Sequence, residues 1–153
     1  MTSVMPTISK LQKAHEEFKK IEPRDFFYWS VSKLVESVLQ SKPLVLNDLV
    51  RSLMMLLTTW NKNYYRFIET RDPDWTLEKH FAELEGVISK YFESLMRFRR
   101  QKIQDTSSIP EDEIQKTFKD FTTVLGRVGA AKCLHLLAPT FFPLWDAAIL
   151  KGF

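Results

Sequence analysis

The sequence has only one cysteine, Cys133, and only four glycines among 153 residues. A single cysteine excludes an internal disulfide and a cysteine-based zinc site, which leaves a small buried hydrophobe or a reactive thiol. The chain has no run of about 18 apolar residues, so no membrane-spanning helix is predicted. Residues 1–6 lack the charged and then apolar order of a secretion signal. No His–Glu spacing indicates a metal site. We therefore expect a cytoplasmic protein without metal, cofactor or membrane association.

The composition is that of a globular domain. Hydrophobic residues make up 44% of the chain and charged residues 27%, which is typical of soluble proteins. Twelve Phe, four Trp and four Tyr predict a core rich in aromatic rings. The net charge of +3 permits nucleic-acid binding without requiring it. The length suits one domain over 1–153, with 1–22 as a loosely docked N-terminal helix because its apolar positions are sparse.

Helical periodicity dominates the pattern, and no segment alternates with period two. Asp25 and Asn47 are candidate N-caps, Pro23 and Pro43 interrupt helices, and Ser108–Glu111 fits a capping box. The pattern predicts an all-α, compact bundle-like domain of six or seven helices with a C-terminal helical hairpin. The expected helices cover about 7–21, 25–40, 47–69, 76–102, 109–125 and 130–137, with a last turn at 146.

Apolar residues three and four positions apart mark the faces that we expect to be buried. In the expected helix 47–69 this face comprises Leu49, Leu53, Leu56, Trp60, Tyr64 and Phe67. Asn61, Asn63 and Tyr65 point elsewhere and could line a groove.

The segment from Val124 to Asp146 departs from plain amphipathic helix. Gly126 and Gly129 predict a tight turn between two helices, the second of which begins near Ala130. Free backbone N–H groups and the helix dipole at that end favour an anion such as a nucleic-acid phosphate. Arg127 and Lys132 flank the site and add positive charge. We therefore expect nucleic-acid contacts at Gly126, Arg127, Gly129, Ala130 and Lys132; the alternative is that the glycines only close a turn.

The segment Gly126–Ile149 resembles the hairpin and following loop of the helix-hairpin-helix DNA glycosylase superfamily. The resemblance implies that the hairpin binds DNA, that Lys132 forms a Schiff base and that Asp146 supports loss of the base. The family hairpin is usually Gly-apolar-Gly, whereas Gly126–Gly129 is one residue longer. Lys132 follows the second glycine by three residues instead of two, and two residues instead of one separate Pro143 from Asp146.

Several further residues could belong to a site. His135, Trp145 and Trp60 are candidates for a pocket, and His135 could pair with Asp146 as acid and base; the alternative is a buried, hydrogen-bonded structural histidine. The basic cluster Arg97–Lys102 suits a helix C-terminus, or it could contact phosphates with Phe98 as a stacking platform. The run 141–145 is a candidate hydrophobic plug over the core, or a partner or base pocket if it is exposed.

These observations leave three functional hypotheses open. The first is a DNA-binding helical domain that resembles a base-excision glycosylase or lyase, in degenerate or truncated form, with Lys132 as nucleophile and Asp146 as its electrostatic partner. The second is a DNA-binding module without the chemistry. The third is a helical protein–protein interaction domain.

Overall fold

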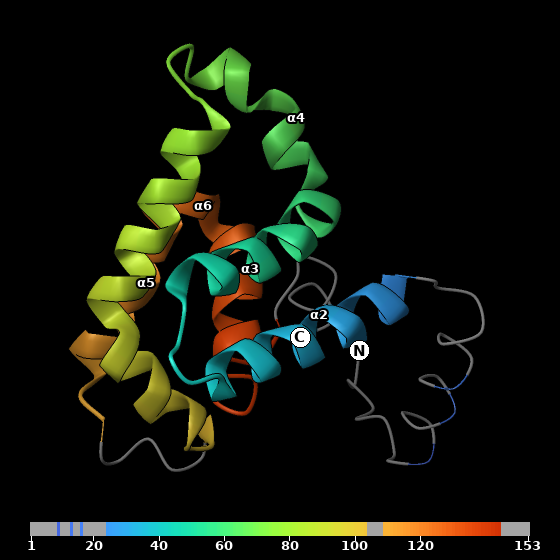
Figure 1. The fold of residues 1–153 in the computed structure, drawn as a ribbon, viewed down its shortest axis with the longest axis vertical. Helices are drawn as coiled ribbons and strands as arrows, with labels where there is room; N and C mark the ends of the chain where they lie inside the picture. The colour runs from blue at the N-terminus through green and yellow to red at the C-terminus, as the bar shows by residue number, and fades with distance from the viewer. Residues whose placement is uncertain (1–8, 10–12, 14–15, 17–23, 104–108, 145–153) are drawn as a thin grey trace, which may run out of the picture.

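The computed structural model describes residues 9, 13, 16, 24–103 and 109–144 of the chain (Figure 1). Within these residues it is all-α, as predicted, with five helices and no strand: α2 (Arg24–Gln40), α3 (Leu46–Trp60), α4 (Lys62–Arg71), α5 (Leu77–Arg99) and α6 (Glu111–Leu137). The predicted count of six or seven helices is not supported. Apart from residues 9, 13 and 16, the expected N-terminal helix lies outside the described residues, as does the expected turn at Asp146.

One predicted helix, 47–69, is in fact two. It is interrupted at Asn61, whose backbone adopts φ −116° and ψ 31°. The backbone N–H of Asn61 still donates to the Leu57 carbonyl, as the last bond of α3. The backbone carbonyl of Asn61 accepts from the Tyr64 N–H and begins the bonding of α4. Residues after the break therefore no longer continue the buried face of α3. Phe67, which we expected in the core, is 44% exposed.

Two predicted helices, 109–125 and 130–137, are instead the two parts of α6, which meet at Gly126 (φ 67°, ψ 167°). We expected a turn over Gly126–Gly129, but only Gly126 leaves helical geometry, and Arg127 already lies in the second part. A positive φ suits glycine because other residues pay a steric cost there. The helix therefore breaks at Gly126. The backbone conformation does not explain why position 129 is also a glycine.

The helix starts also differ from the expected caps. Asn47 lies inside α3, whose N-cap is Val45, and Pro110 is the N-cap of α6 rather than a residue of its first turn. Asp25 lies inside α2, which begins one residue earlier. The start of α5 follows the expected chemistry, because the Thr76 side chain accepts a hydrogen bond from the Lys79 amide at 3.2 Å.

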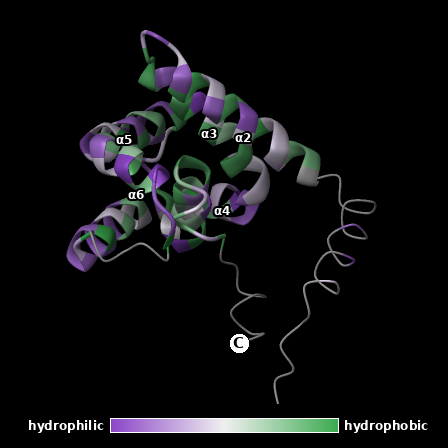
Figure 2. Ribbon diagram, turned by 90° about the horizontal axis from the view of Figure 1, so that it is seen from below, coloured by the Kyte–Doolittle hydropathy of each residue, from purple (hydrophilic) through white to green (hydrophobic). Residues whose placement is uncertain are grey.

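The core lies around α3, which contacts α2, α4, α5 and α6. In Figure 1 the second part of α6, in red, passes behind α3, while α5 runs along the opposite side from α4. Figure 2 shows apolar positions of α3 and α6 turned toward the interior. The largest fully buried side chains are Phe98, Phe121, Leu49, Leu53, Leu56, Leu57, Leu84, Ile88, Leu95, Leu125, Leu134 and Leu137.

The described part of the chain contains no helix that is both long enough and apolar enough to cross a membrane.

Candidate functional site

The break in α6 is capped by residues at the break between α3 and α4. A helix that stops leaves its last carbonyls without intrahelical partners. At the end of the first part of α6, the Val124 carbonyl accepts from the Tyr64 hydroxyl at 2.7 Å. The Leu125 carbonyl accepts from Asn61 Nδ2 at 3.4 Å. Residues about 60 positions away in the sequence therefore hold the Gly126 break in place.

The capping is reciprocal, because a residue of α6 caps the end of α3. Lys132 Nζ donates a hydrogen bond to the carbonyl of Trp60, the last residue of α3. The same ammonium lies 5.7 Å from the centroid of the Trp60 ring. A lysine at a helix C-terminus satisfies a free carbonyl and interacts favourably with the helix dipole. The half-buried Lys132 side chain is thus part of the junction between α3 and α6.

A groove of about 600 Å³ opens beside this junction. We call it the Gly126 groove; its walls come from the start of α4 and from the two sides of the α6 break, and comprise Asn61, Asn63, Tyr64, Arg66, Phe67, Leu125, Gly126, Arg127 and Val128. Arg66, Arg127 and Asn63 are exposed, whereas Asn61 is buried.

The groove favours a negatively charged ligand. Among the described residues that line it, Arg66 and Arg127 are cationic and none is acidic. The second part of α6 begins in the groove at Arg127, directly after the end of the first part. The opposite dipole ends of the two parts meet there, so the positive field of the groove comes from the two guanidinium groups. Exposed Val128 and Phe67 supply apolar contact area beside the charges.

The structure places the predicted nucleic-acid-binding residues in two groups. Gly126 and Arg127 line the Gly126 groove. Gly129 and Ala130 are buried, and Lys132 is not among the lining residues. The exposed end of the helix therefore lies at 126–128, about one turn before the position that the glycine spacing predicts.

Gly129 is buried against the opposite helix break. A Cβ atom at this position would lie 2.8 Å from Asn61 Nδ2 and 2.9 Å from Leu125 Cβ. Close packing, and not a turn, explains this glycine.

The predicted pocket residues Trp60 and His135 belong to a packed aromatic cluster with Tyr28. The Tyr28 ring stacks on Trp60 at 5.4 Å and on His135 at 5.6 Å. His135 Nε2 lies 2.6 Å from the Tyr28 hydroxyl, and its Nδ1 lies 2.8 Å from the Phe142 carbonyl. His135 is thus hydrogen-bonded and structural. Trp145 and Asp146 lie outside the described residues, so the expected pairs of Asp146 with Lys132 and with His135 stay predictions.

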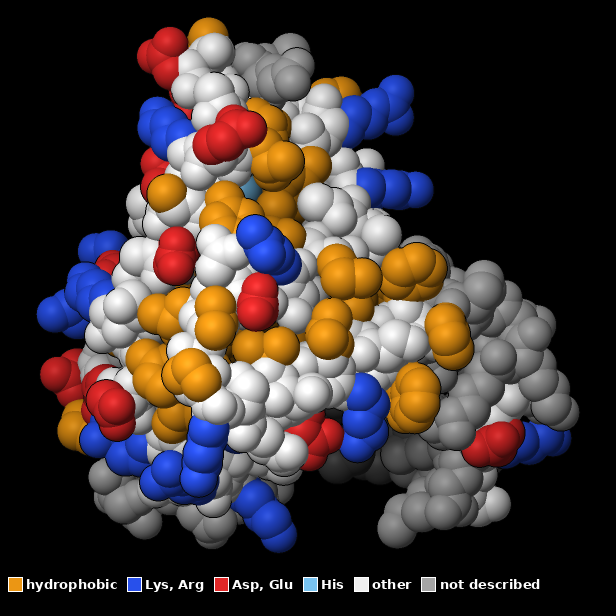
Figure 3. Space-filling model, viewed as in Figure 1, with side chains coloured by type: hydrophobic (Ala, Val, Ile, Leu, Met, Phe, Trp, Pro, Cys, Tyr) orange, Lys and Arg blue, Asp and Glu red, His pale blue; other side chains and the backbone are white. Residues whose placement is uncertain are grey.

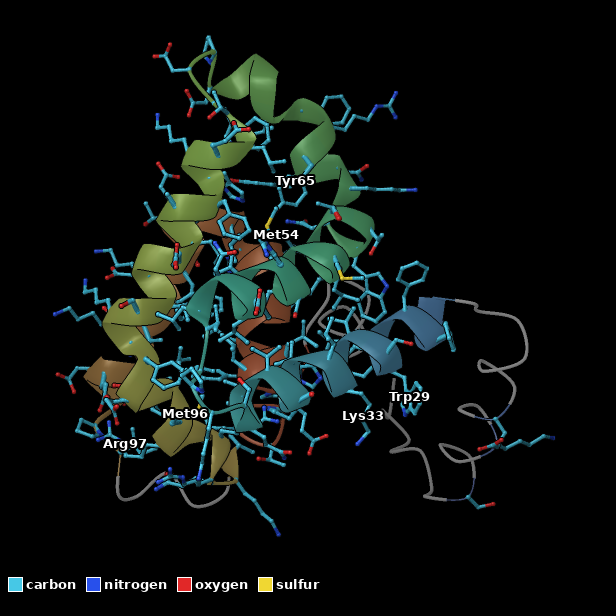
Figure 4. All side chains as sticks on the ribbon, in the orientation of Figure 1. Trp29, Lys33, Met54, Tyr65, Met96 and Arg97 are labelled. Atoms are coloured by element: carbon cyan, nitrogen blue, oxygen red, sulfur yellow. The ribbon has the colours of Figure 1, made fainter. Side chains whose placement is uncertain are left out.

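Tyr65, which we expected to face a groove, packs instead between α3 and α5. Its hydroxyl donates to Met54 Sδ at 3.6 Å and lies 3.1 Å from His80 Nε2. Figure 4 shows Tyr65 and Met54 turned toward each other. Burial raises the pKa of the Tyr65 hydroxyl, so this group stays protonated. Tyr64, expected in the core, takes its place beside the groove.

Two residues of the basic cluster at the end of α5, Arg97 and Arg99, contact other parts of the fold. Blue side chains gather at this end in Figure 3. Arg97 pairs with Glu113 of α6, and Arg99 Nη1 donates to the Leu137 carbonyl at 2.9 Å. Phe98 is fully buried and stacks on Phe141 at 4.8 Å. Phe98 is therefore no stacking platform for a base, and Phe141 acts as the predicted plug over the core.

One other expectation is met by the described residues. Cys133 is fully buried, and burial raises the pKa of its thiol. A thiol without thiolate character is a poor nucleophile, which agrees with the buried-hydrophobe interpretation. No group of three His, Cys, Asp or Glu side chains in the described ranges could hold a metal ion.

Buried His80 and half-buried His135 predict that the fold is less stable in mild acid. Burial lowers the pKa of both His80 and His135 below the usual value of about 6.5. The unfolded chain therefore takes up more protons as the pH falls through this value. The contribution of each histidine to the free energy of unfolding is fully present above this pH. It is lost as the pH falls from there toward the folded-state pKa, at no more than about 1.4 kcal/mol per pH unit for each histidine.

Urea unfolding at pH 7, 6 and 5 measures this loss. We expect His80→Gln and His135→Gln each to flatten the dependence. A wild-type stability that is the same at pH 7 and pH 5 would show that neither histidine resists protonation.

Sequence reasoning missed several groove residues, among them Arg66, Tyr64 and Phe67. The sequence signal was Asn61, because an asparagine inside an expected helix can bond to backbone groups and favour a helix end. The Gly126 groove is the site that the described residues support. Comparison of the chain with models of protein families, with curated proteins and with solved structures found no match.

Proposed function

We propose that this chain binds the phosphate backbone of DNA through the Gly126 groove, without Schiff-base chemistry at Lys132. The observation that carries the proposal is the pair of exposed arginines, Arg66 of α4 and Arg127 of α6, that line one groove beside the α6 break. Guanidinium groups, side-chain amides and helix N-termini are the groups that proteins use to contact phosphates.

The proposed contact recognises the negative charge of the DNA backbone and not the base sequence. A planar guanidinium matches the oxygens of a phosphate with two parallel hydrogen bonds. Arg66 and Arg127 can each engage a phosphate, and the amide of Asn63 can donate a further hydrogen bond. Contacts of this kind position DNA but do not distinguish one base from another. We therefore expect binding that depends strongly on salt and weakly on sequence.

A second observation favours binding over catalysis. A Schiff base requires a free amine that can approach the substrate, whereas Lys132 Nζ is committed to the Trp60 carbonyl and lies against the Trp60 ring. Withdrawing it would leave the end of α3 without this cap. The glycosylase hypothesis therefore requires a rearrangement at the junction that the binding hypothesis does not.

The binding proposal predicts that Arg66→Gln and Arg127→Gln each weaken duplex binding by about five- to thirtyfold, since a charge-assisted hydrogen bond contributes roughly 1–2 kcal/mol. Each change should also reduce the slope of log K against log salt by about one. Fluorescence anisotropy of a labelled duplex at several salt concentrations measures both quantities. Arg51→Gln is the matched control, because Arg51 is exposed on α3, pairs with Asp48 and lies outside the groove.

Equal weakening by Arg51→Gln would mean that net charge alone governs binding. Absence of duplex binding at low salt would refute the proposal and leave a helical interaction domain as the better account.

Borohydride trapping on abasic and damaged duplexes tests the catalytic alternative. We expect no covalent adduct, because Lys132 is held at the end of α3. An adduct that forms in the wild type and disappears in Lys132→Ala would contradict this and restore the glycosylase or lyase hypothesis. Arg66→Gln is a useful companion, since it should weaken DNA binding while leaving Lys132 in place.

A further inference from the structure

A second cavity, of about 400 Å³, lies near the start of α6. We call it the apolar pocket. Its walls come from the chain after α5, from both parts of α6 and from the segment that follows α6, and comprise Ile103, Ile114, Gln115, Phe118, Ala131, Phe141, Phe142 and Pro143. Its volume falls in the range of about 300–1,000 Å³ that small-molecule sites occupy.

The apolar pocket is separate from the Gly126 groove. The two share no lining residue. Their lining residues come within one helical turn of each other on α6, at Val128 of the groove and Ala131 of the pocket. Neither arginine of the groove lines the apolar pocket.

The lining of the pocket is almost free of polar groups. Gln115 is the only polar residue among the described residues that line it, and no lining residue is charged. Gln115 is exposed, and its Nε2 donates to Glu111 Oε1 at 2.8 Å, so this amide is engaged on the helix surface. A ligand with polar edges would lose its hydrogen bonds to water here, at a cost of about 1–3 kcal/mol for each unpaired group.

The aromatic wall of the pocket is held in place by the core. Phe141 stacks on buried Phe98 at 4.8 Å, and Phe142 meets the same ring edge-on at 5.4 Å. The Phe142 amide donates to the Ala138 carbonyl at 2.9 Å, and the Ile103 amide donates to the Thr140 carbonyl at 3.1 Å. These contacts fix the wall before any ligand arrives, which lowers the entropic cost of binding.

We propose that the apolar pocket binds an uncharged, predominantly apolar aromatic molecule of one to three rings. Phe118, Phe141 and Phe142 offer ring faces and edges, and aromatic pairs gain about 0.5–1.5 kcal/mol beyond the area that they bury. A nucleobase of similar size is a poor occupant, because the described lining offers its donors and acceptors one side-chain amide, that of Gln115, which already donates to Glu111. The proposal does not depend on DNA binding at the Gly126 groove.

The test uses N-phenyl-1-naphthylamine, an uncharged probe whose fluorescence rises in apolar surroundings, with naphthalene and adenosine as competitors. We expect saturable binding of one probe per chain, displacement by naphthalene and no displacement by adenosine. Ala131→Leu adds carbon atoms inside the pocket and should weaken binding by about tenfold. Ala82→Leu makes the same change at an exposed position of α5 and should bind as the wild type does.

A measurement on the wild type alone complements the variants. Isotope-filtered NMR should show contacts from naphthalene protons to Phe118 and Phe142. Probe binding that does not saturate, unchanged binding in folded Ala131→Leu, displacement by adenosine, or naphthalene contacts elsewhere would each overturn the proposal.

Discussion

Replacement of Phe98 by alanine is expected to lower the free energy of unfolding by about 3–5 kcal/mol. The Phe98 side chain is fully buried at the end of α5 and contacts both Phe141 and Phe142. Removing the ring leaves a cavity under the segment that follows α6. Urea unfolding monitored by circular dichroism measures the loss.

The matched control is Phe67→Ala, because Phe67 is 44% exposed in the Gly126 groove. We expect Phe67→Ala to lower the free energy of unfolding by about 1 kcal/mol or less, because a half-exposed ring buries less apolar area on folding. Equal losses for Phe98→Ala and Phe67→Ala would contradict the assignment of Phe98 to the core and revive its role as an exposed platform.

The second large effect is expected at Gly129. Replacement of Gly129 by alanine should lower the free energy of unfolding by about 1–3 kcal/mol. The new Cβ would lie 2.8 Å from Asn61 Nδ2 and 2.9 Å from Leu125 Cβ, so the junction has no room for it. Since Asn61 also donates to the Leu125 carbonyl, any shift of its side chain disturbs the cap of the α6 break. The same unfolding measurement applies.

Gly86 provides the control for Gly129. It lies exposed inside α5, and nothing lies within 4 Å of the position that its Cβ would take. Gly86→Ala should therefore stabilise the protein by about 0.5–1 kcal/mol through helix propensity and a less flexible unfolded chain. A stabilising Gly129→Ala would show that the junction is looser than the contacts indicate.

A double variant separates packing from other effects at the junction. Asn61→Ala removes the nearest obstacle to an alanine at 129 but also the hydrogen bond to the Leu125 carbonyl. The combined loss in Asn61→Ala/Gly129→Ala should be smaller than the sum of the two single losses, as for residues in direct contact. Additive losses would indicate that the two residues do not interact.

The helical class and much of the core could be predicted from the sequence. The spacing of Leu49, Leu53 and Leu56 requires a helix with one buried face, and all three side chains are 0–1% exposed. Thr76 was a predictable start because a threonine before a helix can accept from the first free amides. These features depend on residues close together in the chain.

The breaks were harder to predict because their causes lie far apart in the sequence. Asn61 interrupts the helix expected over 47–69, and its side chain donates to the Leu125 carbonyl, 64 residues later. Gly126 was correctly assigned to a break, whereas the role of Gly129 depends on the approach of Asn61. Local pattern does not contain that information.

The candidate site could be predicted only in part for the same reason. Arg127 and Gly126 stood out because glycines and basic residues cluster there. Arg66 joins them only because α4 folds back against the α6 break, where Tyr64 donates to the Val124 carbonyl. Lys132 has the residue type that Schiff-base chemistry requires, but its contact with Trp60 comes from the packing of α6 against α3.

The most direct test of the central proposal is an NMR titration of the ¹⁵N-labelled chain with a short DNA duplex at low salt. The proposal predicts that amide shifts concentrate at Asn63–Phe67 and Gly126–Val128, on the two walls of the Gly126 groove, and that added salt reverses them. Saturable shifts confined to another face, or no shifts under conditions in which the chain is folded, would contradict it.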